Sequence, residues 1–183
     1  MDYAISNWVL NTFGDSKFFA VVMSIFTHLG GWIAVTAILV VLVAFKKTRK
    51  VGLFCTVAVL LTLLVNNAIL KNIVQRTRPF QDYPEMIKIC ELAGYKLPTD
   101  FSMASGHSAS TMAVAVSVFM HSKKWGSVAI GGSVLIGLTR IALLVHYTTD
   151  VLVGWVIGAG LAIGVYFLLK FIDKKIKLKR GKI

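Results

Sequence analysis

The sequence predicts an all-α fold: a polytopic membrane helix bundle with six transmembrane helices and a cluster of polar motifs at the extracytoplasmic face. Hydrophobic residues make up 56% of the 183 residues, and the mean hydropathy is +0.74, well above the balance of soluble globular proteins. Apolar runs of about twenty residues recur, and a helix of that length crosses a bilayer. Short basic segments separate alternate runs, as in the cytoplasmic loops of membrane proteins.

The positive charge is concentrated in one set of loops. The net charge is +12, and thirteen of the twenty Lys and Arg residues lie in residues 46–50, in Lys123–Lys124 and in the tail that begins at Lys170. The alternate loops are nearly neutral. By the positive-inside rule the basic segments are cytoplasmic. The excess charge therefore reflects membrane orientation, and we expect no nucleic-acid partner.

The first apolar stretch, residues 18–45, is interrupted by Gly30 and Gly31. Read as one tilted helix, it spans the membrane once. Read as two helices, the first must borrow from Asn7–Phe13 to reach the thickness of the bilayer. We favour two helices with a turn at the glycines, which makes six helices in all.

The later helices follow from apolar runs bounded by polar loops. The helix at 51–70 leaves the cytoplasm, and the polar loop at 81–100 lies outside. The chain then returns inward along residues 105–120 and crosses outward along 125–145. It comes back to the cytoplasm along 151–171.

We expect a single domain over residues 1–183, with a functional core at 71–150 and a basic cytoplasmic tail at 172–183. Cys55 lies in an apolar run and Cys90 in an outer loop, so we expect neither a disulfide nor a thiolate metal site. The N-terminus lacks the basic region and cleavage site of a signal peptide, so we expect no removable leader.

The first of three polar clusters at the outer helix ends is KNIVQRTRP, Lys71–Pro79. Lys71 and Arg78 are two helical turns apart, so they face one way if the helix continues. Pro79 favours an extended Arg78, which predicts a helix end near that residue. Interfacial snorkelling is the alternative, and it accounts less readily for three cations within eight positions.

The second cluster is Ser105–Gly106–His107, at the mouth of an apolar run. Ser105 is a good N-cap, and Gly106 lets a ligand approach the backbone. The helix start then offers free N–H groups to an anion, and His107 lies in the first turn. The alternative is an ordinary serine cap beside an interfacial histidine.

The third cluster is TRIALLVHYTTD, Thr139–Asp150. His146 and Asp150 are four residues apart, so their side chains meet if the segment is helical. A carboxylate bonded to one imidazole nitrogen leaves the other free as nucleophile or base. Arg140 adds another cation. The alternative is a His–Asp pair near the membrane interface whose two side chains hydrogen-bond to each other and have no catalytic role.

The three clusters together indicate a phosphate site. Ionisable side chains at membrane depth are costly and usually functional. Lys71, Arg78 and Arg140 suit a phosphate or a pyrophosphate. No acidic cluster accompanies them to hold magnesium, so we expect no metal and no cofactor. A nucleophilic histidine with a second histidine as acid makes a phosphohydrolase, and the residues alone leave the two roles unassigned.

These clusters resemble the motifs of the type 2 phosphatidic acid phosphatase family, membrane lipid phosphatases related to vanadium haloperoxidases. The compact chain is similar to small bacterial members. The family's Lys, six residues, Arg-Pro is matched by Lys71, Arg78 and Pro79; its Pro-Ser-Gly-His is matched by Ser105, Gly106 and His107, with Ala104 for the proline; its Ser-Arg, five residues, His, three residues, Asp is matched by Arg140, His146 and Asp150, with Thr139 for the serine.

The resemblance implies an integral membrane phosphatase in which His146 attacks phosphorus and becomes a phosphohistidine. Asp150 then orients His146, and His107 protonates the leaving oxygen and afterwards helps water attack. The groups that hold the phosphoryl oxygens are, by the same resemblance, Lys71, Arg78, Ser105, Gly106 and Arg140. Neither Ala104 nor Thr139 removes a chemical group from the site.

The implied partner is a lipid phosphate in the cell membrane, and no obligate protein partner is implied. Undecaprenyl pyrophosphate, hydrolysed to undecaprenyl phosphate, is the leading substrate. Phosphatidylglycerophosphate and phosphatidic acid follow closely, ahead of lipid A phosphate and soluble phosphate esters. A non-catalytic lipid-phosphate binding or transport protein is the alternative from another class, although such a protein does not need the His146–Asp150 pair.

Overall fold

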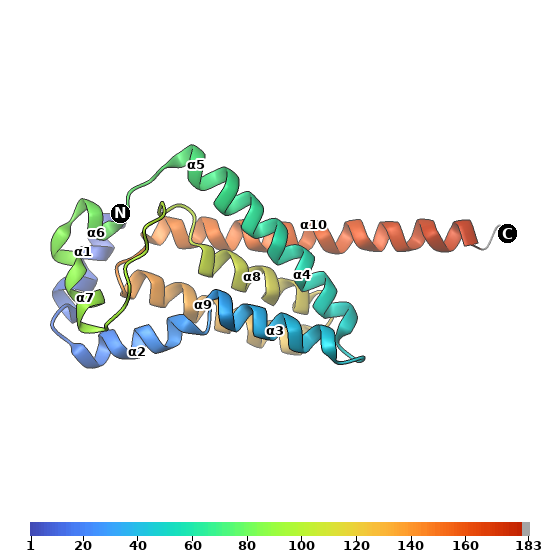
Figure 1. The fold of residues 1–183 in the computed structure, drawn as a ribbon, viewed down its shortest axis with the longest axis horizontal. Helices are drawn as coiled ribbons and strands as arrows, with labels where there is room; N and C mark the ends of the chain where they lie inside the picture. The colour runs from blue at the N-terminus through green and yellow to red at the C-terminus, as the bar shows by residue number, and fades with distance from the viewer. Residues whose placement is uncertain (181–183) are drawn as a thin grey trace.

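The structure is a computed structural model that describes residues 1–180, with side chains described as far as Ile176. Part of the predicted basic tail at 172–183 therefore lies outside the described residues. Over residues 1–180 the chain forms helices, turns and loops and no strand (Figure 1). The helices are α1 Asp2–Phe13, α2 Lys17–His28, α3 Trp32–Ala44, α4 Arg49–Leu63, η1 Leu64–Leu70, α5 Lys71–Val74, α6 Pro79–Asp82, η2 Pro84–Met86, α7 Ile87–Leu92, α8 Gly106–Phe119, α9 Lys123–Ala142 and α10 Thr148–Arg180.

The centre of the bundle is α8, which packs against α4, α9 and α10. Small side chains on α8 let the backbones approach closely, as in other membrane helix pairs. At Gly158 of α10, an added Cβ atom would lie 2.2 Å from the carbonyl oxygen of Ala109. Close packing of this kind fixes where α8 begins relative to α10, and both of these helix starts carry motif residues.

Four segments of the described chain are long and apolar enough to cross a membrane: Lys17–Ala44, Arg49–Asp82, Lys123–Ala142 and Thr148–Ile176. The central helix α8 has 14 residues and is shorter than these. The second segment contains α4, the π-helix η1, α5 and α6. The prediction of six transmembrane helices is therefore not confirmed.

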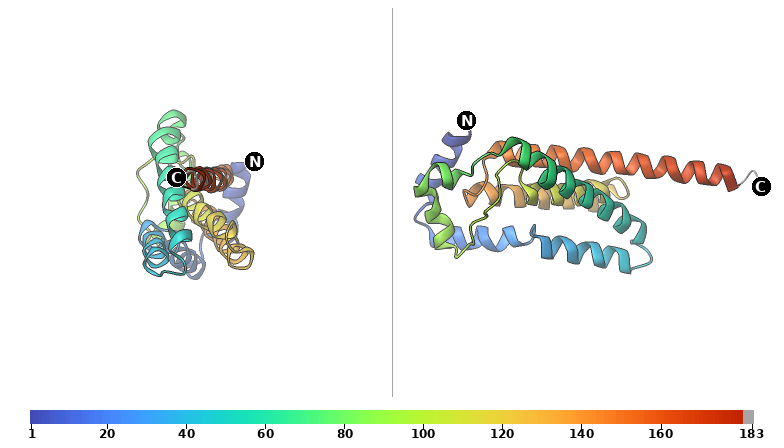
Figure 2. Two further views of the ribbon diagram at one scale, coloured as in Figure 1. Left: turned by 90° about the vertical axis from the view of Figure 1, so that its right-hand side faces the viewer. Right: turned by 45° about the horizontal axis from the view of Figure 1, so that its top comes forward.

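The predicted break at Gly30 and Gly31 is confirmed, but the predicted return across the membrane is wrong. The helix α2 ends at His28 and α3 begins at Trp32, yet α3 continues in the same general direction (Figures 1 and 2). The N–H of Gly30 bonds back to Thr27 over 3.0 Å, and an added Cβ there would lie 2.4 Å from Ile136. The glycines thus make a kink that packs on α9. Asn7–Phe13, which was expected to extend the first of these helices, belongs to the separate helix α1.

The predicted polar loop at 81–100 is also more ordered than expected. It contains η2 and α7, together with the end of α6. Its apolar side chains Met86, Ile89 and Cys90, with Phe80 of α6, form a small core against residues that follow α9. The partners from that segment are Leu143, Leu144 and Val145. We call residues 79–97 the cap. Both Cys55 and Cys90 are buried free thiols.

The basic segments and the motif residues lie at opposite ends of the bundle. The α3–α4 and α8–α9 connections and the far end of α10 are at one end, whereas α1, the cap and the turn before α10 are at the other (Figure 1). Three segments distant in sequence, at 71–78, 102–107 and 140–150, therefore meet at the cap end.

Candidate active site

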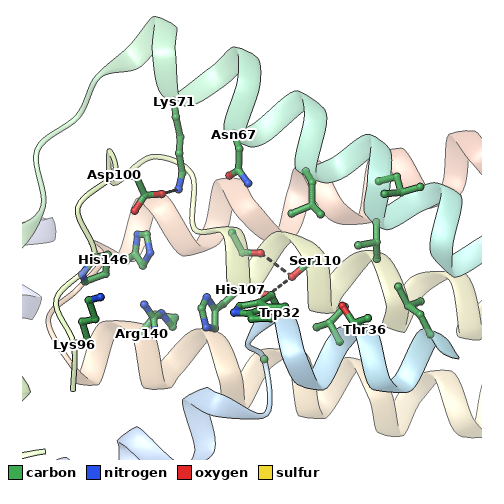
Figure 3. A pocket seen from close by; sticks show the side chains of 18 of the residues that line it. Trp32, Thr36, Asn67, Lys71, Lys96, Asp100, His107, Ser110, Arg140 and His146 are labelled. Atoms are coloured by element: carbon green, nitrogen blue, oxygen red, sulfur yellow. Dashed lines mark hydrogen bonds and ion pairs between the residues drawn. The ribbon is translucent and has the colours of Figure 1, made fainter. Parts of the chain in front are cut away.

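A cavity of about 1240 Å³ opens at the cap end of the bundle. Its polar end is lined by Lys71, Arg78, Gly106, His107, Arg140 and His146, and Figure 3 shows four of these side chains around one space. Away from the polar end it continues as an apolar groove between α3 and α4, lined by Trp32, Val35, Leu39, Val43, Val59, Leu60 and Leu63.

Six of the eight predicted site residues thus line one cavity, and the other two lie directly behind it. Asp150 and Ser105 are both fully buried. Ser105 caps α8 as predicted, because its side chain accepts a bond from the Ser108 N–H. The backbone N–H of Ser105 donates to the carbonyl oxygen of Asp150 over 3.0 Å, which joins the second motif to the third.

Lys71 and Arg78 converge without sharing a helix face. The helix α5 ends at Val74 because Gln75 has a φ of 48°. The helix therefore does not continue to Arg78, which was the condition for a shared face, and it ends a few residues earlier than the proline predicted. Arg78 is extended before Pro79, with φ −91° and ψ 157°, as predicted from the proline. The two cations come from a helix end and from the loop that follows it.

Both cations are paired with a residue that the sequence did not single out. Asp100 forms an ion pair with Lys71 and accepts a bond from Arg78 Nη2 over 2.8 Å. Arg78 Nε also donates to the backbone oxygen of Asp100 over 2.8 Å. Burial raises the pKa of Asp100, but the bond from Lys71 and the charges of Lys71 and Arg78 outweigh burial and hold this pKa below its usual range. Asp100 is therefore an anion at neutral pH.

The segment before Ser105 is held by Asn66 of the π-helix η1. Asn66 Nδ2 donates to the oxygen of Ala104 over 3.0 Å, and the N–H of Ala104 donates to Asn66 Oδ1 over 3.2 Å. A proline at 104 has no N–H to make the second bond. Asn66 therefore supports the turn at the position where this chain departs from the proline of the family motif. Two asparagines in an apolar run were the only sequence signal for this contact.

His146 lies in a turn before α10, not on a helix, so the predicted helical contact with Asp150 is wrong. The turn includes Leu144 at a φ of 54°, and α10 begins at Thr148. His146 Nδ1 is 3.7 Å from Asp150 Oδ2, which is longer than a hydrogen bond. The hydroxyl of Ser102 lies between them, 3.4 Å from His146 Nδ1 and 2.5 Å from Asp150 Oδ2. The Ser102 hydroxyl therefore bridges His146 and Asp150. No pattern in the sequence indicated this contact.

The surroundings of His146 define its tautomer. Arg78 Nη1 is 3.2 Å from His146 Nε2, and a guanidinium only donates. Nε2 must therefore accept, and Nδ1 carries the proton toward Ser102. Burial, followed by the charges of Arg78, Arg140 and Lys71, holds the pKa of His146 well below its usual range. The imidazole is neutral at pH 7, and the lone pair of Nε2 is at the polar end of the cavity.

Arg140 is fixed from two other elements. Its Nη1 donates to Thr27 Oγ1 of α2 over 2.8 Å and to Tyr95 Oη of the cap over 2.7 Å. Arg140 therefore depends on the kinked first segment and on the cap, two regions that the motif spacing did not connect to the site. Cations, a helix N-terminus and a neutral imidazole are the groups that suit a phosphoryl ligand.

Residues 50–173 match the PAP2 superfamily. An undecaprenyl-diphosphatase of Sulfolobus acidocaldarius is 32% identical over 129 residues, which cover 70% of this chain and 58% of the relative. The chain therefore spans less than two thirds of the length of that relative. A phosphatidylglycerophosphatase B of Bacillus subtilis is 31% identical, with 88% of this chain and 78% of the relative covered.

Two solved structures are similar to this one. The crystal structure of a transmembrane PAP2 type phosphatidylglycerolphosphate phosphatase from Bacillus subtilis has a TM-score of 0.70 and 28% identity, with 96% of this chain and 85% of that chain covered. The Aquifex aeolicus LpxE structure has a TM-score of 0.71 and 22% identity, with 90% and 94% covered, and it supports the fold alone. Because the family match extends over more than half of the sequence, this chain belongs to the PAP2 superfamily, whose motifs it was predicted to carry.

Proposed function

We propose that this protein is a membrane lipid phosphatase that hydrolyses a lipid phosphate or pyrophosphate through a phosphohistidine on His146, without a metal. Its membership of the PAP2 superfamily, and its similarity to an undecaprenyl-diphosphatase and a phosphatidylglycerophosphatase, support hydrolysis of a lipid phosphate. The observation that carries the mechanism is the neutral His146, whose Nε2 shares the polar end of the cavity with Lys71, Arg78 and Arg140.

The proposed reaction has two steps. His146 Nε2 attacks phosphorus, the bond from phosphorus to the leaving oxygen breaks, and His107 supplies a proton to that oxygen. Water then attacks the phosphohistidine, with His107 taking its proton, and inorganic phosphate leaves. Asp150 and Ser102 keep the proton on His146 Nδ1, and their negative charge and dipole stabilise the cationic ring that forms.

The phosphoryl oxygens are held by donors from three segments. Lys71 and Arg78 approach from the first motif, Arg140 from the third, and the Gly106 N–H lies in the first turn of α8. Ser105 acts mainly as the cap that exposes this turn. These donors are fixed before substrate arrives, so they stabilise developing charge without reorganisation.

The apolar groove between α3 and α4 supports a substrate with a long hydrocarbon tail. Undecaprenyl pyrophosphate is our first candidate, and the similarity to an undecaprenyl-diphosphatase supports it. Phosphatidylglycerophosphate is the second, because the similarity to the Bacillus subtilis phosphatases in sequence and structure covers most of the chain. Phosphatidic acid carries the same terminal phosphate.

We further propose that the chain is a multi-pass protein of the cell membrane with its active site at the extracytoplasmic face. The basic segments lie at the end of the bundle opposite the polar end of the cavity, and basic loops are retained in the cytoplasm. A lipid substrate then enters sideways from the outer leaflet while its tail remains in the bilayer.

Phosphate release by purified protein in detergent with EDTA tests the proposal. The panel is undecaprenyl pyrophosphate, phosphatidylglycerophosphate and phosphatidic acid, with His146→Ala beside the wild type. The matched control is His121→Ala, because His121 follows α8 at the other end and packs on Phe54 and Tyr166.

We expect release by the wild type and by His121→Ala, no release by His146→Ala, and an acid-labile phosphoryl label on the quenched wild type. Activity of His146→Ala would reject the nucleophile. No release by any variant, with phosphate still bound, would instead support a lipid-phosphate binding protein.

A further inference from the structure

Arg76 lies between the two phosphate-binding cations of the first motif but does not line the cavity. The left-handed turn at Gln75 directs it the other way, toward the carboxylate of Asp150. Arg76 Nη1 donates to Asp150 Oδ1 over 2.7 Å and to Thr149 Oγ1 over 2.7 Å. Its guanidinium carbon lies 4.1 Å from the centre of the Tyr147 ring. Nothing in the reaction proposed above uses this side chain.

The second amino group of Arg76 binds a carboxylate from the first helix. Arg76 Nη2 donates to Asp2 Oδ2 over 2.8 Å. Asp2 also accepts bonds from the backbone N–H of Thr149 over 3.2 Å and from the Thr149 hydroxyl. The side chain of Asp2 is 16% exposed and that of Asp150 is fully buried. Helix α1 is thereby joined to the first turn of α10, one residue from Asp150.

These contacts immobilise the carboxylate of Asp150. Oδ1 is held by Arg76, and Oδ2 is held by the Ser102 hydroxyl and by the Tyr147 N–H over 2.9 Å. The carboxylate therefore cannot rotate away from the Ser102 bridge to His146. Arg76 binds the carboxylates of both Asp2 and Asp150, so its single positive charge does not fully neutralise Asp150. Negative charge remains beside the ring of His146, which becomes cationic when it is phosphorylated.

We propose that Asp2 and Arg76 are positioning residues for the hydrolysis, acting through Asp150 and Ser102 on His146. The inference rests on the proposed function in that it takes His146 as the nucleophile. It assigns helix α1, which no motif reaches, to the catalytic apparatus. Loss of Asp2 is expected to slow the chemical step and to leave the phosphate-binding cations untouched.

The first test is Asp2→Asn, with Asp15→Asn as the matched control. Asp15 follows α1, is 90% exposed and, within the described part of the chain, forms its ion pair with Lys88. We expect Asp2→Asn to lower kcat about tenfold or more, by analogy with the loss seen when the outer partner of a metal-ligating side chain is mutated, with KM unchanged. Asp2→Glu should recover part of the rate, and Asp15→Asn should behave as wild type.

A double-mutant cycle separates positioning from general destabilisation. In an Asp150→Asn background, Asp2→Asn should cost little further kcat, because the group that it positions is already lost. A reduction by the same factor in both backgrounds would overturn the proposal, as would an unchanged kcat in Asp2→Asn alone. If Asp2→Asn fails to fold, Arg76→Lys takes its place, since a lysine cannot bind both carboxylates in the same fork geometry.

A readout without turnover keeps this proposal distinct from the proposed function. The imidazole nitrogen NMR signals of His146, assigned by their absence in His146→Ala, report the tautomer directly. A single tautomer in the wild type and a mixture in Asp2→Asn would support positioning even if no lipid in the panel were hydrolysed. The same tautomer in both proteins would contradict it.

Discussion

Replacing Asp100 by Asn tests whether the site carries its own competitor for phosphate. The carboxylate of Asp100 is bound to Lys71 and to Arg78 Nη2, two of the cations that we assign to the phosphoryl group. An arriving phosphate must take these donors from Asp100. Asparagine has the same shape and retains the backbone oxygen that accepts from Arg78 Nε, so the substitution removes the charge and keeps the loop in place.

The expected gain in phosphate affinity follows from the exposure of the three side chains that form the two ion pairs. The side chain of Asp100 is 55% exposed, whereas those of Lys71 and Arg78 are 8% and 2% exposed. Solvent screening of Asp100 reduces each ion pair to about 0.5–1 kcal/mol, the upper part of the range for exposed pairs. Two pairs amount to about 1–2 kcal/mol, and inorganic phosphate should bind about 5- to 30-fold more tightly to Asp100→Asn.

Calorimetric titration with inorganic phosphate in detergent at neutral pH measures the effect, and competitive inhibition of turnover by phosphate gives a second value. Glu85→Gln is the matched control, because Glu85 is an exposed acid of the cap that is not among the partners of Lys71 or Arg78. It removes one charge from the same end of the protein. We expect its phosphate affinity to remain near that of the wild type.

An unchanged or weaker affinity in Asp100→Asn would refute the reasoning. Weaker binding would mean that Asp100 holds Lys71 and Arg78 in the geometry that phosphate needs. A gain of equal size in Glu85→Gln would mean that the overall charge of the cap governs affinity, and not the two contacts seen here.

Four further outcomes are expected. Asp150→Asn should lower kcat at least about 100-fold, because the tautomer of His146 is no longer fixed; a rate near that of wild type would remove Asp150 from the mechanism. Turnover should persist in EDTA, since the donors assigned to phosphate are cationic side chains and a backbone N–H; loss that magnesium restores would contradict this. Burial and nearby cations lower the pKa of His146, so the neutral nucleophile persists to lower pH. The acid limb of kcat/KM should therefore lie below pH ~6.5, the ordinary value for histidine, and a limb at or above that pH would be evidence against it. Gly158→Ala should lower the Tm in detergent, because its Cβ would lie 2.2 Å from the oxygen of Ala109, and overpacking costs about 1–3 kcal/mol. Gly160→Ala, where an added Cβ meets nothing within 4 Å, should leave the Tm unchanged.

The helical character of the chain and the chemistry of its site were predictable because their signals are local. Apolar runs long enough to cross a bilayer predict helices whatever they pack against. The serine before Gly106 predicts the start of α8, and Pro79 predicts an extended Arg78, from backbone sterics alone.

Where local patterns admitted two geometries, the sequence did not decide between them. Glycines at 30 and 31 are compatible with a reversal or a kink, and close packing of Gly30 against Ile136 of α9 favours the kink. The spacing of four between His146 and Asp150 fits a helix, but the segment forms a turn through Leu144. The sequence also suggested that the cap is a polar loop, because its apolar residues are scattered. The structure shows that these residues share a core with the segment that follows α9.

By itself, the sequence determined the composition of the candidate site: which cations, which histidines and which helix start gather at the cap end of the bundle. Only the tertiary structure decided how those groups are held. Asp100 on the cations, Ser102 between His146 and Asp150, and Asp2 behind Arg76 come from segments far from the residues that they bind. A serine or an aspartate in a loop carries no local pattern that names its partner, because hydrogen bonds and ion pairs depend on distances that arise only when the helices pack.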